Sequence, residues 1–165
     1  MDDLRLTRVP VMETGMLIRR PVAEVFEAFV DPAITTRFWF TKSSGRLEAG
    51  KQVQWDWEMY GASAPVTVKA VQPHSRIVIE WQGLKDQTVT VEWRFTPRED
   101  GTTYVAITET GYAGTGDELV AQATDSMGGF TLVLAGLKAL LEHGIELDLV
   151  RDRYPEGIGQ GQPAD

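Results

Sequence analysis

Glu109 is the residue whose type and position best suggest chemistry. It continues the alternation of Val105 and Ile107, so its carboxylate should point to the same face of a strand as their side chains. A carboxylate facing an apolar interior must be paired, hydrogen-bonded, protonated or near an opening, and there it could act as a general base or orient a ligand. The alternative places Glu109 at the rim of the sheet, in solvent or paired with Arg94 or Lys42.

Other catalytic groups are scarce. The chain has no cysteine and only two histidines, His74 in an expected turn and His143 near the end of an expected helix. Zinc ligands are therefore lacking, and a Ser-His-Asp triad would need one of these peripheral histidines. The glycines of 111–116 lack the Lys-Ser/Thr of a phosphate-binding loop. The sequence thus predicts no catalytic residue, no metal and no cofactor.

Charge and length limit the partners. With 16 basic and 24 acidic residues the net charge is −8, which opposes binding to nucleic acid or anionic membranes. The sequence shows neither an apolar run that could span a bilayer nor a signal-peptide pattern, so a cytoplasmic location is expected. We expect one domain over residues 1–150. Residues 151–165, rich in Gly, Gln and Pro, are expected to form a partly flexible tail.

Two periodicities indicate the elements that hold Glu109. Apolar and polar residues alternate in several segments separated by turn signals, which predicts consecutive strands. Two short helices are expected between the first strand and the others, the second following Pro32. The expected strands cover 9–19, 51–60, 66–71, 77–81, 89–95 and 103–109, and the expected helices start at 21 and 32.

The segment from Gly116 to Gly144 predicts a long amphipathic helix. Apolar residues recur there in steps of three and four, with Asp117 and Glu118 at the end where a helix favours anions. Gly128-Gly129 interrupts this pattern, because glycine costs about 1 kcal/mol relative to alanine inside a helix. The pair indicates either a bend or close packing contact, or a helix that thins to leave room for a ligand.

These elements predict an α+β fold: a curved antiparallel sheet of six or seven strands wrapped around a long C-terminal helix. The face toward the helix is unusually aromatic. Such a face either forms an ordinary core or lines a cavity for an apolar small molecule. The candidate ligand-binding residues are Trp39, Trp55, Trp57, Met59, Trp81, Trp93, Phe95, Ile107, Glu109, Met127, Phe130 and Thr131.

The order of elements and several local patterns resemble the START-like, or Bet v 1-like, helix-grip superfamily. Within it, the chain is similar to bacterial proteins related to the activator of Hsp90 ATPase. One departure is Phe130, where related bacterial proteins usually carry tryptophan after the equivalent of Gly129. The segments that carry the resemblance are 18–32, 38–39, 73–81, 101–105, 129–138 and 141–144.

The resemblance implies a helix-grip fold with a cavity between sheet and helix, and it leaves three functions open. The first is binding of a small hydrophobic or aromatic ligand, in a carrier, sensor or stress-related role. The second is a cyclase- or dehydratase-like enzyme that uses a cavity carboxylate such as Glu109. The third is an Hsp90-type chaperone regulator. The expected partner is a small apolar molecule, and homodimerisation is left open.

Overall fold

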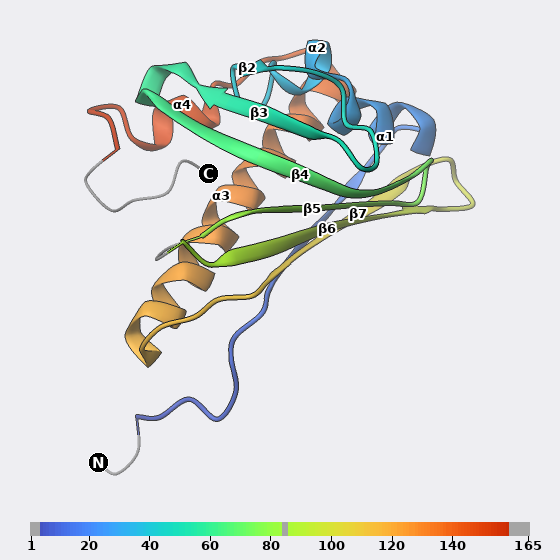
Figure 1. Cartoon of the computed structure of the whole chain (residues 1–165). Coiled ribbons are helices and arrows are strands. Elements are labelled where there is room, and N and C mark those ends of the chain that lie inside the picture. Colours follow the sequence, from blue (N-terminus) through green and yellow to red (C-terminus); the bar gives the residue numbers. More distant parts are fainter. Residues whose placement is uncertain (1–3, 84–85, 159–165) are drawn as a thin grey trace.

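The computed structural model describes residues 4–83 and 86–158, and its architecture is a curved sheet around one long helix (Figure 1). The sheet has seven strands in the order β1-β7-β6-β5-β4-β3-β2, all antiparallel. The strands are β1 (Met12–Ile18), β2 (Lys42–Ser43), β3 (Gln52–Trp57), β4 (Ala62–Gln72), β5 (Arg76–Gln82), β6 (Thr88–Pro97) and β7 (Thr103–Thr110). The helices are α1 (Val22–Val30), α2 (Pro32–Thr35), the 3₁₀ helix η1 (Glu58–Tyr60), α3 (Gly116–His143) and α4 (Leu149–Arg153).

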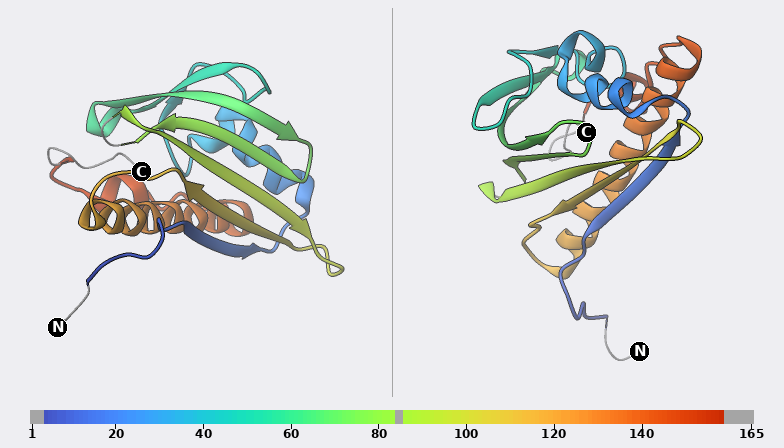
Figure 2. Two further views of the ribbon diagram at one scale, coloured as in Figure 1. Left: turned by 60° about the horizontal axis from the view of Figure 1, so that its bottom comes forward. Right: turned by 90° about the vertical axis from the view of Figure 1, so that its right-hand side faces the viewer.

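The chain meanders from β2 to β7 and then uses its first strand to complete the sheet. Met12 pairs with Glu109 and Ile18 with Thr103, so β1 lies beside β7. The long helix α3 crosses the concave side of the sheet, and α1 and α2 cover the other end of the same side (Figure 2). The expected α+β helix-grip fold is confirmed.

The helix α3 has well-defined ends that the sequence explains. Thr115 and Glu118 form a reciprocal capping box, in which each side chain accepts a hydrogen bond from the other residue's backbone N–H. Gly144 closes the helix in the left-handed conformation, with φ of 66°. Between these ends the helix runs unbroken through Gly128-Gly129. The glycine pair therefore does not break the helix.

Polar contacts fasten the C-terminal half of α3 to β1. The hydroxyls of Thr14 and Thr131 are 2.8 Å apart. Nearer the end of the helix, Lys138 Nζ donates to the backbone carbonyl of Leu17 at 2.8 Å. These contacts fix the rotation of α3 about its axis, and this rotation decides which of its side chains face the sheet.

Glu142 is expected to make the attachment of α3 dependent on pH. It accepts hydrogen bonds from the Arg19 N–H at 2.8 Å and from Lys138 Nζ at 2.7 Å. Burial opposes its ionisation, but these two donors outweigh burial and hold the pKa of Glu142 below its ordinary value near 4.5. The stabilisation is therefore complete above that value and is lost as the pH falls through the lower pKa of the folded protein.

We expect Glu142→Gln to lower the free energy of unfolding by about 1 kcal/mol at pH 7 and by much less at pH 3. Urea unfolding at both pH values measures this difference. Glu13→Gln, at an exposed position of β1, is the matched control for loss of a charge. An equal effect of Glu142→Gln at both pH values would contradict the prediction.

The structure departs from the expected elements at a few points. The two-residue strand β2 was not predicted, because its apolar pattern is too short to detect. The strand expected over 51–60 ends at Trp57 and continues as η1, which Gly61 terminates with a φ of 62°. The tail expected from residue 151 begins inside α4, and its part beyond residue 158 lies outside the described residues.

In the described part of the chain, no helix has the length and apolarity that crossing a membrane requires.

Candidate ligand-binding site

The five tryptophans gather on the side of the sheet that α3 covers, and we call them the tryptophan cluster. Four come from the strands, and Trp39 reaches them from the segment after α2. Small residues make room for the large rings, because Ala62 and Ala64 of β4 lie directly opposite Trp57 and Trp55. The members of the cluster are Trp39, Trp55, Trp57, Trp81 and Trp93.

Trp39 occupies the centre of this cluster. Its ring centroid lies 4.8 Å from that of Trp55, 6.4 Å from that of Trp57 and 6.0 Å from that of Trp93. On the helix side, the ring of Phe130 lies 5.5 Å from it. These are ordinary distances for aromatic contacts, so the rings pack as one unit between sheet and helix.

Glu109 lies at the edge of the cluster and is only 6% exposed. Its Oε2 accepts a hydrogen bond from Trp81 Nε1 at 2.8 Å, and its Oε1 accepts one from the Tyr112 hydroxyl at 2.9 Å. Arg94 bonds Glu92 instead. The inward orientation of Glu109 is therefore confirmed, and the alternative of a solvent-facing or Arg94-paired rim position is wrong.

The other candidate residues divide into buried and peripheral ones. Phe95, Ile107 and Phe130 are buried as expected. Met127 is 44% exposed, so its placement on the inner face was wrong. The buried stripe of α3 passes through Ser126 instead, one residue away, because the helix turns by about 100° per residue.

Met59 and Thr131 lie at the periphery. Met59 belongs to η1 rather than to a strand, and it packs against the core from a half-buried position. Thr131 is half-buried, and its hydroxyl bonds Thr14 of β1. Both residues can border the cluster, but neither places a free polar group in it.

Several polar atoms between sheet and helix are buried without a hydrogen-bond partner among the described residues. The indole N–H groups of Trp39, Trp57 and Trp93 belong to this set, and so does the Ser126 hydroxyl. Their side chains are between 1% and 4% exposed. Most buried polar groups in proteins are paired, since leaving one unpaired costs about 1–3 kcal/mol. These four groups lie in one region, between the sheet and α3.

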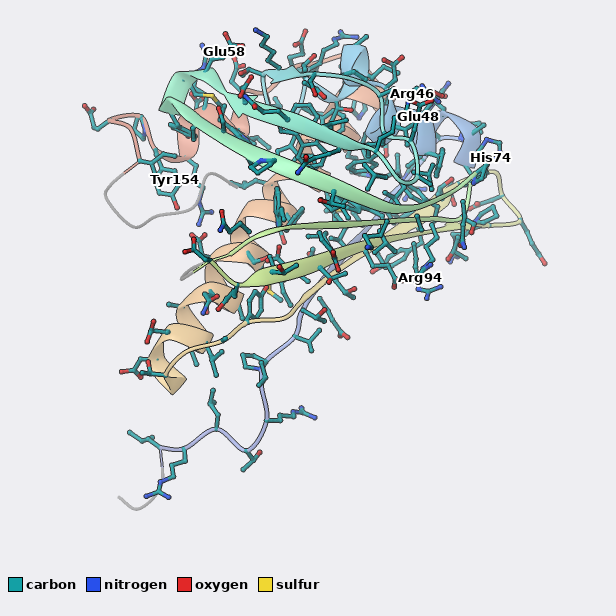
Figure 3. All side chains as sticks on the ribbon, viewed as in Figure 1. Arg46, Glu48, Glu58, His74, Arg94 and Tyr154 are labelled. Atoms are coloured by element: carbon teal, nitrogen blue, oxygen red, sulfur yellow. The ribbon has the colours of Figure 1, made fainter. Side chains whose placement is uncertain are left out.

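The helix α4 covers one end of the space between sheet and α3. Tyr60 donates to the backbone carbonyls of Val150 and Arg151. The ring centroids of Tyr60 and Tyr154 lie 6.0 Å apart. Figure 3 shows Tyr154 at this end of the sheet, far from His74 at the other end. Burial raises the pKa of Tyr60, which keeps its hydroxyl available as a donor.

Arg153 packs against Gly128, the first of the two mid-helix glycines. Its guanidinium nitrogens approach Gly128 so closely that a Cβ there would lie 2.8 Å from Nη1. The same guanidinium lies 3.6 Å from Asp125 Oδ1. Gly128 therefore permits a close packing contact with the end of α4, which agrees with the interpretation of the glycine pair as a close packing contact.

Tyr60→Phe should loosen α4 while leaving the sheet intact. The variant loses the hydroxyl that binds the Val150 and Arg151 carbonyls, at a cost of about 1 kcal/mol. We expect faster hydrogen exchange in residues 149–154 and unchanged exchange in β5 and β6. Tyr104→Phe, on the outer side of β7, is the control. Unchanged exchange of α4 in the Tyr60 variant would contradict this role.

A hollow lies on the surface away from the tryptophan cluster. It is an open groove of about 600 Å³ between α1, α2 and the C-terminal end of α3, with Ile34, Leu140 and Leu141 among its apolar lining residues. None of the candidate residues lines this groove.

In the described part of the chain, no group of three or more His, Asp or Glu side chains is arranged to hold a metal ion.

Two residues of the site were missed by sequence reasoning. Tyr112 follows β7 in an irregular segment with no periodicity, and only the fold brings its hydroxyl to Glu109. Ser126 was missed because the sequence analysis assigned the buried position to its neighbour Met127, which is the more apolar residue. A 100° helical projection through Ala123 and Phe130 places Ser126 and Met127 at equal angles on either side of their mean direction, so these two residues could not have decided between them.

Comparison with known proteins agrees with this geometry. Residues 19–142 match the family described as activator of Hsp90 ATPase homolog 1-like protein. The crystal structure of protein SSP2350 from Staphylococcus saprophyticus is 30% identical, with a TM-score of 0.71 over 84% of this chain and 96% of that one. DynU16, from the dynemicin biosynthetic locus, is 21% identical, with a TM-score of 0.71 over 82% of this chain and 48% of that one. The Aha1 dimer from Colwellia psychrerythraea is 16% identical, with a TM-score of 0.67 over 82% of this chain and 98% of that one.

The two likenesses below 25% identity show the fold alone, and no curated protein sequence matches the chain significantly. The family match is stronger, because it runs from the residue after β1 almost to the end of α3 and so includes strands β2 to β7 and nearly all of the helix that covers the tryptophan cluster. The chain therefore belongs to the family of activator of Hsp90 ATPase homolog 1-like proteins.

Proposed function

We propose that the protein binds a small hydrophobic or aromatic molecule between the sheet and α3, at the tryptophan cluster. The observation that carries this proposal is Glu109, a carboxylate buried among aromatic rings and held by Trp81 and Tyr112. Small-molecule sites combine apolar and aromatic walls with a few fixed polar groups in this way. A carrier, sensor or stress-related role would follow from such binding.

The position of α4 supports the same proposal. The tryptophan cluster is enclosed by the sheet and α3, and α4 lies at one end of this enclosure, attached through Tyr60 and Tyr154. A short helix at the chain end is easier to displace than a strand of the sheet. Displacement of α4 would give a ligand access to the cluster without disrupting the sheet.

Native mass spectrometry of the freshly purified protein tests the proposal, with a repeat measurement after denaturation. A mass excess that disappears on unfolding would identify a bound molecule and its mass. In parallel, three-ring aromatic hydrocarbons and ketones are titrated while tryptophan fluorescence is recorded. Met127→Ala, on the exposed side of α3, is the control variant. No mass excess together with no saturable binding of any probe would count against the proposal.

A second candidate is an enzyme of the cyclase or dehydratase type, which the burial of Glu109 favours. Each of its oxygens accepts one hydrogen bond and retains a further lone pair, so a base role does not require either bond to break. A turnover screen that compares the wild type with Glu109→Gln distinguishes the two functions. Loss of turnover with retained binding would support the enzyme.

Chaperone regulation is the third candidate and comes from the family description. It requires a surface for a protein partner, and homodimerisation could contribute one, as the Aha1 dimer from Colwellia illustrates for that protein. A pull-down with the host Hsp90 tests chaperone regulation. Light scattering of the purified protein measures its oligomeric state and so tests homodimerisation.

A further inference from the structure

The segment 4–11, which precedes β1 and which we call the N-terminal arm, turns apolar side chains to solvent. Leu4, Leu6, Val9 and Val11 are between 46% and 89% exposed, and they are four of the nine large apolar side chains that are exposed among the described residues. In an extended segment, residues two apart point to the same side, so Leu4 lies with Leu6 and Val9 with Val11. Single exposed apolar residues are ordinary, whereas a gathering of them marks an interaction surface.

The open groove between α1, α2 and the C-terminal end of α3 is a matching apolar surface. Its apolar lining residues include Ile34, Leu140 and Leu141. The chain that leaves α3 runs along its border, because Glu146 lies 3.5 Å from Arg37, which lines the groove. Ile145 and Leu147 on either side of Glu146 are both exposed. They extend the apolar surface beyond the groove itself, which suits an extended apolar segment as its occupant.

The arm and the groove lie at opposite ends of the molecule (Figure 1 and Figure 2). The arm passes the start of α3, where a Cβ added at Gly116 would lie 3.9 Å from Leu6 Cγ. The groove reaches Gly144, which closes the same helix 28 residues later, a span of about 42 Å. The arm also leaves β1 in the direction away from the groove, so it would have to reverse to reach the groove of its own molecule. A second copy in the antiparallel orientation presents its groove at the end where the arm emerges.

We propose that two copies of this chain exchange their N-terminal arms, each arm docking in the groove of the other copy. The exchange is reciprocal and follows a two-fold axis, so it closes as a dimer and does not continue into a filament. With its eight arm residues, the nine described lining residues of the groove and Ile145 and Leu147, each copy brings about 20 residues to the interface. Stable complexes use roughly 20–30 residues per partner, and one arm without the exchange would supply only half of this contact. The arm and the groove share no residue with the tryptophan cluster, so the dimer is independent of the proposed ligand site.

Opposite charges accompany the apolar surfaces. The charged residues of the arm are Arg5 and Arg8, and the carboxylates of Glu24 and Glu27 line the α1 side of the groove. A hydrogen bond from Arg46 lowers the pKa of Glu27, which keeps this carboxylate ionised at neutral pH. The present ion pairs of both glutamates are largely exposed, and such pairs contribute little, so the carboxylates can also accept the arginines of an incoming arm. These charges fix the register of the arm more than its affinity.

Sedimentation analysis of the wild-type protein over a range of concentrations should show a monomer–dimer equilibrium with no larger species. The double variant Leu4→Ser, Leu6→Ser alters the arm, and Ala23→Arg fills the groove from an exposed position of α1. Each should raise the dimer Kd about tenfold or more, because it removes both docking contacts of the dimer.

The matched controls are Thr7→Ala, a polar position of the arm, and Ala33→Arg, an exposed alanine of α2 that does not line the groove. Both should leave the dimer Kd unchanged. A wild-type protein that stays monomeric at every concentration would overturn the proposal, and so would a dimer that neither the arm variant nor the groove variant weakens.

Mixing the two variants tests the exchange itself. The arm variant keeps an intact groove and the groove variant keeps an intact arm, so a mixed dimer has one complete docking contact while a dimer of either variant alone has none. At equal total concentration the mixture should therefore contain more dimer than either variant by itself. A mixture that dimerises no better than its components would show that the arm does not occupy the groove.

Nuclear magnetic resonance identifies which copy supplies the arm. Because the chain has no cysteine, Thr7→Cys gives a single attachment point for a spin label. When this labelled protein, at natural isotope abundance, is mixed with ¹⁵N-labelled wild type, the amide signals of Ala23, Glu27 and Leu141 in the wild-type copy should broaden. If these signals broaden only when the ¹⁵N and the spin label are in the same diluted copy, the arm folds back onto its own molecule and the proposed exchange is wrong.

Discussion

Replacement of Trp39 by alanine is expected to lower the free energy of unfolding by about 3–5 kcal/mol, the usual cost of removing a large buried aromatic side chain. Trp39 is buried in the centre of the cluster, so its loss leaves a cavity that no single neighbour can fill. The rings that lose a contact are Phe40, Trp55, Trp57, Trp81, Trp93 and Phe130. Urea unfolding followed by far-ultraviolet circular dichroism measures the change.

Two companion variants make this result specific. Trp39→Phe keeps part of the ring and should cost clearly less than the alanine variant. Met127→Ala removes an exposed side chain of α3 and should change stability by less than about 0.5 kcal/mol. A loss of under about 1.5 kcal/mol in Trp39→Ala would show that the cluster can collapse around the missing ring.

The second large effect is expected from Glu109→Ala, which should cost about 2–4 kcal/mol. The substitution removes a side chain that is 6% exposed, and with it the acceptor for Trp81 Nε1 and for the Tyr112 hydroxyl. The N–H of the half-buried Trp81 would then lose its acceptor. Chemical unfolding at pH 7 measures the loss.

Removing the donors together with the acceptor should recover much of this stability. In the triple variant Glu109→Leu, Trp81→Phe and Tyr112→Phe, no member of the hydrogen-bonded group remains to be left unsatisfied. Replacing all partners of a buried bond by apolar groups can be nearly neutral. If the triple variant is as unstable as Glu109→Ala or less stable, the cost arises from packing rather than from lost hydrogen bonds.

The strands and the long helix could be predicted because each has one buried face. Alternation placed Trp55, Trp57, Trp93 and Glu109 on the inner side of the sheet, and all four are buried there. The helical stripe was predicted over nearly its whole length. Met127 was assigned wrongly, because steps of three and four along a helix can be combined in more than one way and apolarity alone does not choose between them.

The polar partners could not be predicted, because they depend on register between distant segments. Trp81 reaches Glu109 only because β5, β6 and β7 pair in a register that puts Val91 opposite both Ile79 and Glu109. Sequence periodicity fixes the face to which a side chain points but does not fix this alignment along the strands. Likewise, the contact of Arg153 with Gly128 requires the chain to turn back after α3.

The pairing of the first strand with the last one also determines when the fold can be completed. Among the described residues the only strand next to β1 is β7, so about 85 residues must be synthesised after Ile18 before its partner begins. At roughly 5–20 residues per second this takes several seconds, during which β1 has no strand to pair with. Such distant pairing is also slow to form during refolding. We therefore expect the meander from β3 to β6 to acquire structure on the ribosome before the N-terminal strand does.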